Sequence, residues 1–142
     1  MNDPYNLRRF MDAQSGVYEQ VRSELREGRK RSHWMWFIFP QVKGLGHSQM
    51  AQTFAITSKD EAAAYVSHTV LGPRLRECTQ LVTEVEGRTL EEILGYPDNL
   101  KFRSSMTLFA QVAADNQLFV AALGKYCNGE LDPATLELLG NA

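Results

Sequence analysis

Aromatic, polar and glycine residues follow one another closely between Ser32 and Ser48. Aromatic faces contribute about 1–3 kcal/mol for each stacked base, and a glycine loop lets backbone amides approach a phosphate. The segment predicts a pocket for a nucleotide-like small molecule, lined by His33, Trp34, Trp36, Gln41, Lys43, Gly44, Gly46 and Ser48. The alternative is that the aromatic side chains belong to the core, where a buried indole N–H still needs a hydrogen-bond partner.

Four polar residues outside this segment are suited to holding a phosphate: Arg74, Lys101, Ser104 and Ser105. The last three follow Pro97-Asp98 near an expected helix start, where free backbone amides favour anions. The favoured alternative is capping by Asp98 or Asn99 together with two exposed serines, which explains the same residues without a ligand. Arg74 has its own alternative, a surface ion pair with Glu77 on the same helix face.

Several well-defined chemistries are absent from the sequence. The Gly44–Gly46 stretch is too short for a Walker or dinucleotide loop, and no metal-binding spacing of His or Cys occurs. We therefore expect neither a metal nor another cofactor. The net charge of −2 disfavours a nucleic-acid partner. The basic run from Arg26 to Arg31 is compatible with a solvated helix end or with an anion-facing patch.

The sequence also bears on location. Its start lacks the apolar core of a secretory signal. The longest apolar run, Trp34 to Phe39, has six residues, whereas a membrane span needs about 20, so we expect no membrane partner. Cys78 and Cys127 are too far apart for a local metal site and are typical of small apolar side chains in a reducing compartment. The expected location is the cytoplasm.

Hydrophobic periodicity predicts helices along most of the chain. A first helical stretch is expected from Asp3 to Glu27, broken or bent at Ser15-Gly16. Later helices are expected at 58–68, 72–86, 89–94, 102–113, 118–126 and 132–139. Between them, residues 32–48 predict a short, mostly buried extended segment leading into a glycine loop, although the length also fits a buried helical turn. We expect a mainly α fold, in a single multi-helical domain over residues 1–142.

These stretches together resemble the signature of domain-of-unknown-function family 1810. The motifs that carry the resemblance are Ser32-His-Trp-Met-Trp-Phe-Ile-Phe-Pro-Gln41, Gly44 to Ser48, Glu61 to Tyr65, Leu71 to Glu77, Gly95 to Lys101, Arg103 to Phe109 and Gly129 to Leu139. The resemblance covers nearly the whole chain and implies a compact, mainly α-helical fold. It implies no activity, because none is established for the family.

The order of parts also resembles, more distantly, the NADAR superfamily of helical domains associated with NAD and ADP-ribose chemistry. The similar parts are the aromatic segment, the acidic-alanine helix at 61–66, the turn at 71–74, the helix carrying Met106 and the tail at 123–132. The aromatic-Ser-Asn motif with which NADAR domains begin is absent.

The NADAR resemblance implies hydrolysis of an N-glycosidic bond in a phosphorylated riboside. Such a reaction needs a carboxylate to activate water and a ring stacked on the base. The resemblance selects Glu61 and Asp132 as catalytic carboxylates and Trp36 as the ring. From the residues alone, both carboxylates have capping explanations, because Glu61 follows Ser58 in a capping box and Asp132 precedes a first-turn proline.

The patterns support two hypotheses from different functional classes. The first is a domain that binds a nucleotide-like ligand and hydrolyses an N-glycosidic or ADP-ribose-type bond. The second is a non-catalytic protein-interaction module. A solvent-open cleft that contains Trp34 and Trp36 together with Arg74 or Lys101 would favour the first. The sequence leads to no prediction of substrate identity or oligomeric state.

Overall fold

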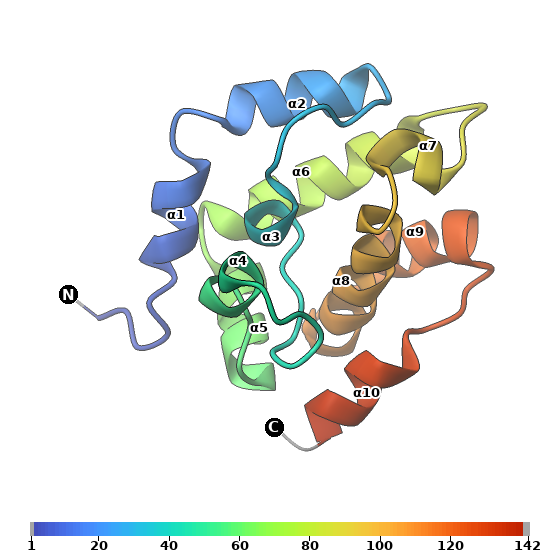
Figure 1. Cartoon of the computed structure of the whole chain (residues 1–142). Coiled ribbons are helices and arrows are strands. Elements are labelled where there is room, and N and C mark those ends of the chain that lie inside the picture. The colour runs from blue at the N-terminus through green and yellow to red at the C-terminus, as the bar shows by residue number, and fades with distance from the viewer. Residues whose placement is uncertain (1, 141–142) are drawn as a thin grey trace.

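The computed structural model describes residues 2–140 and shows a mainly α architecture (Figure 1). The helices are α1 (Arg8–Gln14), α2 (Tyr18–Arg26), α3 (Met35–Ile38), α4 (Gln49–Thr53), α5 (Lys59–Ser67), α6 (Leu71–Glu84), α7 (Leu90–Leu94), α8 (Asp98–Val112), α9 (Gln117–Cys127) and α10 (Pro133–Gly140). In the described part of the chain, β-type pairing is limited to one parallel bridge between Val42 and Ile56. The expected fold class is confirmed.

Helix α8 lies at the centre of the fold and is buried on most of its sides. Every residue from Ser104 to Ala110 is buried, and α5, α7, α9 and α10 pack around it. Aromatic rings link it to its neighbours, since Phe109 lies 5.4 Å from Tyr65 of α5 and 6.0 Å from Phe119 of α9, measured between ring centres. These four helices are thus arranged around α8.

Helix α6 connects the two halves of the chain, because it packs against α2, α3 and α5 on one side and α9 on the other. Its start lies against the end of α5. A Cβ atom built on Gly72 would lie 2.2 Å from the carbonyl oxygen of Val66, far inside van der Waals contact. Only glycine permits this approach, which brings the end of α5 and the start of α6 into one wall.

The first helical stretch is two helices, α1 and α2, with a break at Ser15-Gly16. Gly16 has a φ of +81°, a backbone conformation that glycine adopts without strain. Helix α1 starts later than expected, because Asp3 lies outside it and accepts hydrogen bonds from the amides of Leu7 (2.8 Å) and Arg8 (3.1 Å). The break lets α1 pack beside α3 while α2 packs on α6.

The aromatic part of the expected extended segment is instead the alternative, a buried helical turn, α3. The amides of Phe37 and Ile38 both donate to the carbonyl of Trp34, at 3.3 and 3.2 Å. Extended pairing is confined to residues 41–43, which exchange hydrogen bonds with Ile56. A short, uniformly apolar run has no periodicity that separates a buried turn of helix from a strand.

Two expected helix starts are present. Thr89 and Glu92 form the expected capping box at α7. The hydroxyl of Ser58 caps α5 by accepting from the amide of Glu61 at 3.1 Å. The reciprocal half of that second box is absent, because Oε1 of Glu61 accepts from the amide of Thr57 instead, at 2.9 Å.

Candidate functional site

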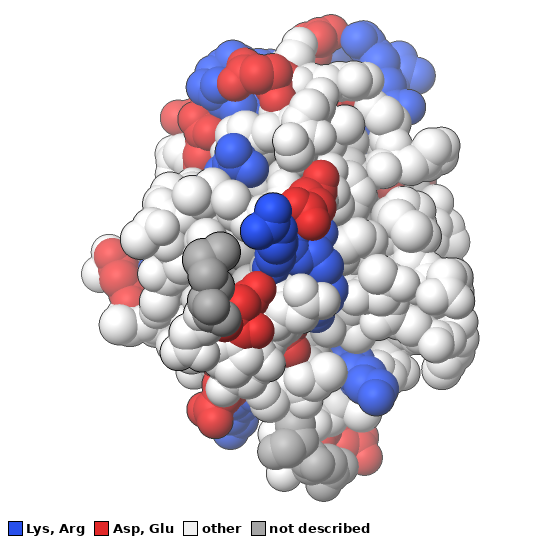
Figure 2. Space-filling view, turned by 90° about the vertical axis from the view of Figure 1, so that its left-hand side faces the viewer, with Lys and Arg blue, Asp and Glu red and all other residues white. Residues whose placement is uncertain are grey.

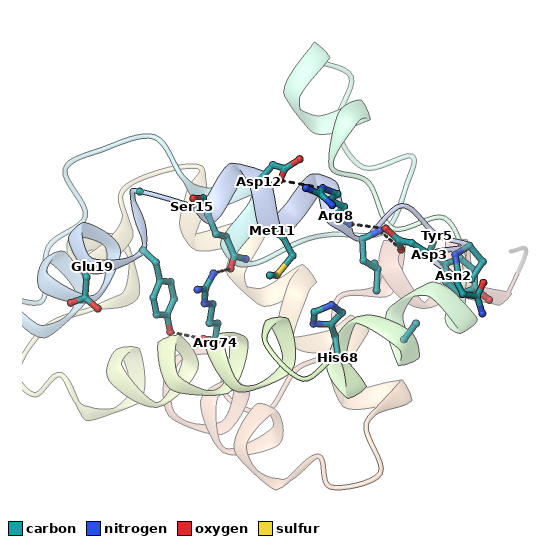
Figure 3. Close-up of a pocket in the computed structure, with 16 residues that line it drawn as sticks. Asn2, Asp3, Tyr5, Arg8, Met11, Asp12, Ser15, Glu19, His68 and Arg74 are labelled. Atoms are coloured by element: carbon teal, nitrogen blue, oxygen red, sulfur yellow. Dashed lines mark hydrogen bonds and ion pairs between the residues drawn. The ribbon is translucent and has the colours of Figure 1, made fainter.

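A groove of about 1100 Å³ lies between α1 and the wall made by α5 and α6. The N-terminal segment 2–5, α1 and the start of α2 form one side, and Ala64, His68 and Arg74 form the other. Figure 3 shows Arg74 and His68 extending from the α5–α6 side toward α1. The end of α5 and the start of α6 are held together at Gly72, so the groove has a rigid wall.

Arg74 is a cation in this groove that forms no ion pair within residues 2–140. Its Nη1 donates to Oε1 of Gln14 at 3.1 Å, and its guanidinium carbon lies 4.6 Å from the centre of the Tyr18 ring. The alternative pairing with Glu77 is not formed, because Glu77 lies 3.2 Å from Arg22. Both partners of Arg74 are neutral, so no carboxylate compensates its charge within residues 2–140.

Hydrogen bonds fix the two neutral residues that hold this guanidinium. Gln14 is 1% exposed, and its Nε2 donates to the carbonyl of Phe37 (2.8 Å) and the hydroxyl of Tyr65 (3.3 Å). The hydroxyl of Tyr18 donates to Oε1 of Glu77 at 2.5 Å. Burial raises the pKa of Tyr18 far above its ordinary value by disfavouring the phenolate. The phenol therefore stays a donor, and the guanidinium is held in one place.

His68 is the second polar group on the same wall. Its Nδ1 accepts from the amides of Val70 (3.0 Å) and Leu71 (3.2 Å) at the start of α6. These bonds assign the proton of the neutral ring to Nε2. The amide of Gly72 donates to the His68 carbonyl at 3.0 Å, and Pro73 has no amide hydrogen. The first amides of α6 are thus already used, and recognition at this wall depends on side chains.

Five charged residues line the groove: Asp3, Asp12, Glu19, Arg8 and Arg74. The carboxylates have local partners. Asp12 pairs with Arg8 at 3.7 Å and Glu19 with Arg22 at 2.6 Å, while the backbone hydrogen bonds to Asp3 lower the pKa of its carboxyl. Figure 2 shows the face that carries α1, where acidic and basic groups alternate without a continuous patch of either sign.

The predicted ligand-binding residues between 33 and 48 lie outside this groove. Trp34 is 2% exposed and its indole N–H donates to Glu24 at 2.9 Å. Trp36 is half-buried, and Nζ of Lys101 lies 5.3 Å from the centre of its ring. The fold thus brings the aromatic segment and the start of α8 together as expected. The lysine there is 3.4 Å from Asp98, so its charge has an internal partner.

The glycine loop packs closely against its surroundings. Trp36, Gln41, Gly44 and Gly46 line a void of about 10 Å³, which has room for about one water molecule. A Cβ at Gly44 would lie 3.2 Å from the side chain of Leu138, and one at Gly46 would lie 2.7 Å from Ala51. Close packing therefore accounts for both glycines.

Three further residues of this segment lie at the surface: His33, Lys43 and Ser48. Ser48 caps α4, because its hydroxyl accepts from the amide of Ala51 at 3.1 Å. No hydrogen bond in residues 2–140 joins the side chains of His33 or Lys43 to another residue of the predicted pocket. The side chains of His33 and Lys43 are therefore accessible only from the outside of the loop.

The residues predicted to hold phosphate do not converge on one point. Lys101 pairs with Asp98, and Arg74 lies in the groove. The hydroxyl of Ser104 donates to the carbonyl of Leu100 (3.2 Å) and to Oδ2 of Asp132 (2.9 Å). Ser105 is fully buried, and its hydroxyl has no hydrogen-bond partner within the described residues. Only Arg74 among these lines the groove.

Glu61, predicted as a catalytic carboxylate, belongs to a structural network. It is buried, with Oε2 accepting from Nη2 of Arg9 at 2.7 Å and Oε1 from the amide and hydroxyl of Thr57. Arg9 also donates to the carbonyls of Thr53 and Ala55. The pair fastens α1 to the segment that leads into α5.

Asp132, the other predicted carboxylate, fastens the start of α10 to α8. Its Oδ2 accepts from the hydroxyls of Ser104 (2.9 Å) and Thr135 (2.5 Å), and its amide donates to Thr107 at 3.0 Å. Neither Asp132 nor Glu61 lines the groove. Their hydrogen bonds give both carboxylates structural roles, although within the described residues neither side chain accepts from a helix amide as the capping alternative expected.

No group of three or more His, Cys, Asp and Glu side chains within residues 2–140 is arranged to hold a metal ion. None of the helices there is long and apolar enough to cross a bilayer.

Gln14, Tyr18 and His68 are groove residues that the sequence analysis did not select. Tyr18 falls in the apolar stripe of its helix, and Gln14 and Arg74 are 60 positions apart. His68 had a local signal, because a side chain just before a helix start with an acceptor atom is placed to cap that helix.

The fold and the groove define an all-α domain with a polar surface groove built on side chains. The chain belongs to the family described as "Protein of unknown function (DUF1810)", whose model matches residues 4–139. This confirms the family resemblance expected from the motifs, and the NADAR resemblance stays a prediction.

The chain is similar to a solved crystal structure, that of the conserved hypothetical protein Rv1873 from Mycobacterium tuberculosis. The two share 56% sequence identity and superpose with a TM-score of 0.96, over 97% of this chain and 99% of the other. No curated protein matches this chain.

Proposed function

We propose that this domain binds a small, anionic, nucleotide-like ligand in the groove between α1 and the α5–α6 wall, with Arg74 holding a phosphate. One observation carries the proposal. The guanidinium of Arg74 lines the groove, forms no ion pair with any residue from 2 to 140, and is fixed by Gln14 and Tyr18. A planar guanidinium matches phosphate bidentately, and a side chain fixed in advance loses less entropy on binding.

The rest of the groove supports a ligand of this kind. Its volume of about 1100 Å³ suits a nucleotide-sized molecule. Tyr5, Met11 and His68 line it and offer aromatic and polarizable surface to a base. The Nε2–H of His68 adds a neutral donor on the same wall as Arg74.

Hydrolysis of an N-glycosidic or ADP-ribose-type bond is the reaction that the distant NADAR resemblance implies. The carboxylates which that resemblance selects, Glu61 and Asp132, lie outside the groove. The proposal therefore assigns them no catalytic role and concerns binding alone. Whether a bound riboside is hydrolysed would be measured separately, on the same complex.

Ligand binding is tested by thermal shift and by ¹H–¹⁵N NMR titration of the full chain with nucleotides, NAD, ADP-ribose and phosphorylated ribosides. A ligand at a hundred times its Kd should add about 2.7 kcal/mol of stability. Arg74→Lys keeps the charge but loses the planar fork, so we expect Kd to rise at least about tenfold.

Arg76→Lys is the matched control. Arg76 lies on the same helix, donates to a backbone carbonyl and lies over the ring of Phe119, yet it does not line the groove. Binding should be unchanged in this variant. Equal binding by wild type and Arg74→Lys would refute the assigned site, and a flat screen would refute the proposal and favour a protein-interaction module.

A further inference from the structure

The charges around the groove define a narrower class of ligand than nucleotides in general. Resting on the proposed function, we infer that the ligand carries one anionic group, held by Arg74, and that the remainder is uncharged or cationic. The groove accordingly discriminates against polyphosphates.

The positive side of the groove offers one place for an anion. Arg8, the other guanidinium in the lining, is already paired with Asp12 at 3.7 Å. The amides of Leu71 and Gly72 at the start of α6 are taken by Nδ1 and the carbonyl of His68. A second phosphate therefore finds neither an unpaired side-chain cation nor free amides on this wall.

The negative side opposes any further anionic charge. Asp3, Asp12 and Glu19 lie along the N-terminal segment, α1 and the start of α2, and with Arg8 and Arg74 they give the lining a net charge of −1. Asp12 and Glu19 are paired with Arg8 and Arg22, whereas Asp3 forms no ion pair within residues 2–140. Figure 3 shows Asp3 and Glu19 at opposite ends of the groove.

A ligand that extends from Arg74 toward the N-terminal segment approaches Asp3, the lining carboxylate that no cation pairs within residues 2–140. Two like charges 4 Å apart in water repel enough to weaken binding about fivefold. A cationic group on the ligand should strengthen binding by a similar factor, and added salt should reduce both effects.

The inference is tested by titrating the full chain at low salt with adenosine monophosphate, diphosphate and triphosphate. We expect the affinity to fall about fivefold with each added phosphate. NAD, whose nicotinamide ring is cationic, should bind more tightly than ADP-ribose, which lacks that ring.

Asp12→Asn removes one carboxylate whose side chain is 70% exposed, so the fold should be retained. The affinity for the triphosphate should rise relative to the monophosphate in this variant. Glu137→Gln changes the same charge at an exposed position of α10, outside the groove, and should leave the ratio unchanged.

The outcomes separate the two claims. Binding that depends on Arg74 but strengthens with each phosphate overturns this inference and leaves the proposed function intact. An unchanged ratio in Asp12→Asn overturns it as well. If no probe binds in an Arg74-dependent manner, the proposed function itself is overturned and the inference with it.

Discussion

Glu24 is a buried carboxylate that accepts five hydrogen bonds and forms no ion pair within residues 2–140. Its donors are the amides of Arg31 and Ser32, the hydroxyl of Ser32, the indole of Trp34 and the amide group of Gln20. Burial alone would raise the pKa of Glu24, but the hydrogen bonds from Ser32, Arg31 and Trp34 outweigh burial and lower it to about 2. The residue fastens the segment after α2 to that helix.

Glu24→Gln should destabilise the fold by about 3 kcal/mol. This is the free energy of folding that corresponds to lowering the pKa of Glu24 from 4.5 to about 2. The folded-state pKa lies below the unfolded one, so the stabilisation is complete above pH 5 and is lost as the pH falls toward 2. Urea unfolding at a series of pH values should show this loss in wild type and a flatter profile in the variant.

Glu27→Gln is the control for that measurement. Glu27 pairs with Arg31 on the surface, with 47% of its side chain exposed, and such pairs contribute about 0–1 kcal/mol. A wild-type stability that stays constant between pH 5 and 2 would contradict the role given to Glu24.

At the scale of elements, the wall of the groove depends on how closely α5 and α6 approach. Gly72 has no space for a Cβ beside the carbonyl of Val66. His68 then caps α6 through Nδ1, and Arg74 follows on the first turn. The end of one helix thereby sets the position of both polar groups on the α5–α6 wall.

Gly72→Ala should destabilise the domain by about 1–3 kcal/mol, because backbone atoms must shift to make room. We also expect Arg74 to bind the ligand more weakly in this variant, because the backbone shift moves α6, which carries Arg74. Thermal unfolding and the NMR titration measure the two effects.

Gly124→Ala is the matched substitution in α9, where nothing lies within 4 Å of a new Cβ. It should stabilise the helix by about 0.5–1 kcal/mol, because alanine loses less backbone entropy than glycine. Equal effects of the two substitutions would contradict the tight packing of α5 on α6.

At the scale of the whole molecule, one core extends from α1 to α10, and a domain of this size is expected to unfold as one unit. Cys78 lies within that core on α6, whereas Cys127 is half-buried at the end of α9. Burial raises the pKa of the Cys78 thiol to about 12. The two thiols should therefore become accessible through different unfolding events.

Labelling of Cys78 by a thiol reagent should require global unfolding and should become faster as stability falls, for instance in Glu24→Gln. Labelling of Cys127 should be faster and insensitive to that substitution, because local fraying of α9 exposes it. Mass spectrometry of the labelled protein over time distinguishes the sites. Equal rates would show that α6 opens independently of the rest.

The local sequence pattern was sufficient to predict most of the helices and the ends of several of them. Ser58 and Thr89 cap α5 and α7 as expected, because a cap involves residues three positions apart. The apolar stripes of α6 and α9 likewise mark the faces that are buried. The sequence left the choice between a strand and a helical turn open at α3, because four residues contain no full period of either kind of structure.

The site could not be found in the same way. Glu61 and Trp34 have the residue types of a catalytic carboxylate and a stacking ring, yet structural hydrogen bonds engage both side chains. Arg9 reaches Glu61 from 52 positions away, and Glu24 binds the indole of Trp34 from the preceding helix. Arg74 was selected for its charge alone.

Composition and periodicity determine that this chain folds into helices around an apolar core, since those preferences act over a few neighbouring residues. The groove arises only when α1 and α2 are laid against α5 and α6. Gln14 and Tyr18 meet Arg74 from more than 50 positions away. Whether a charged side chain is neutralised or left facing solvent depends on such distant partners, and tertiary packing alone selects them.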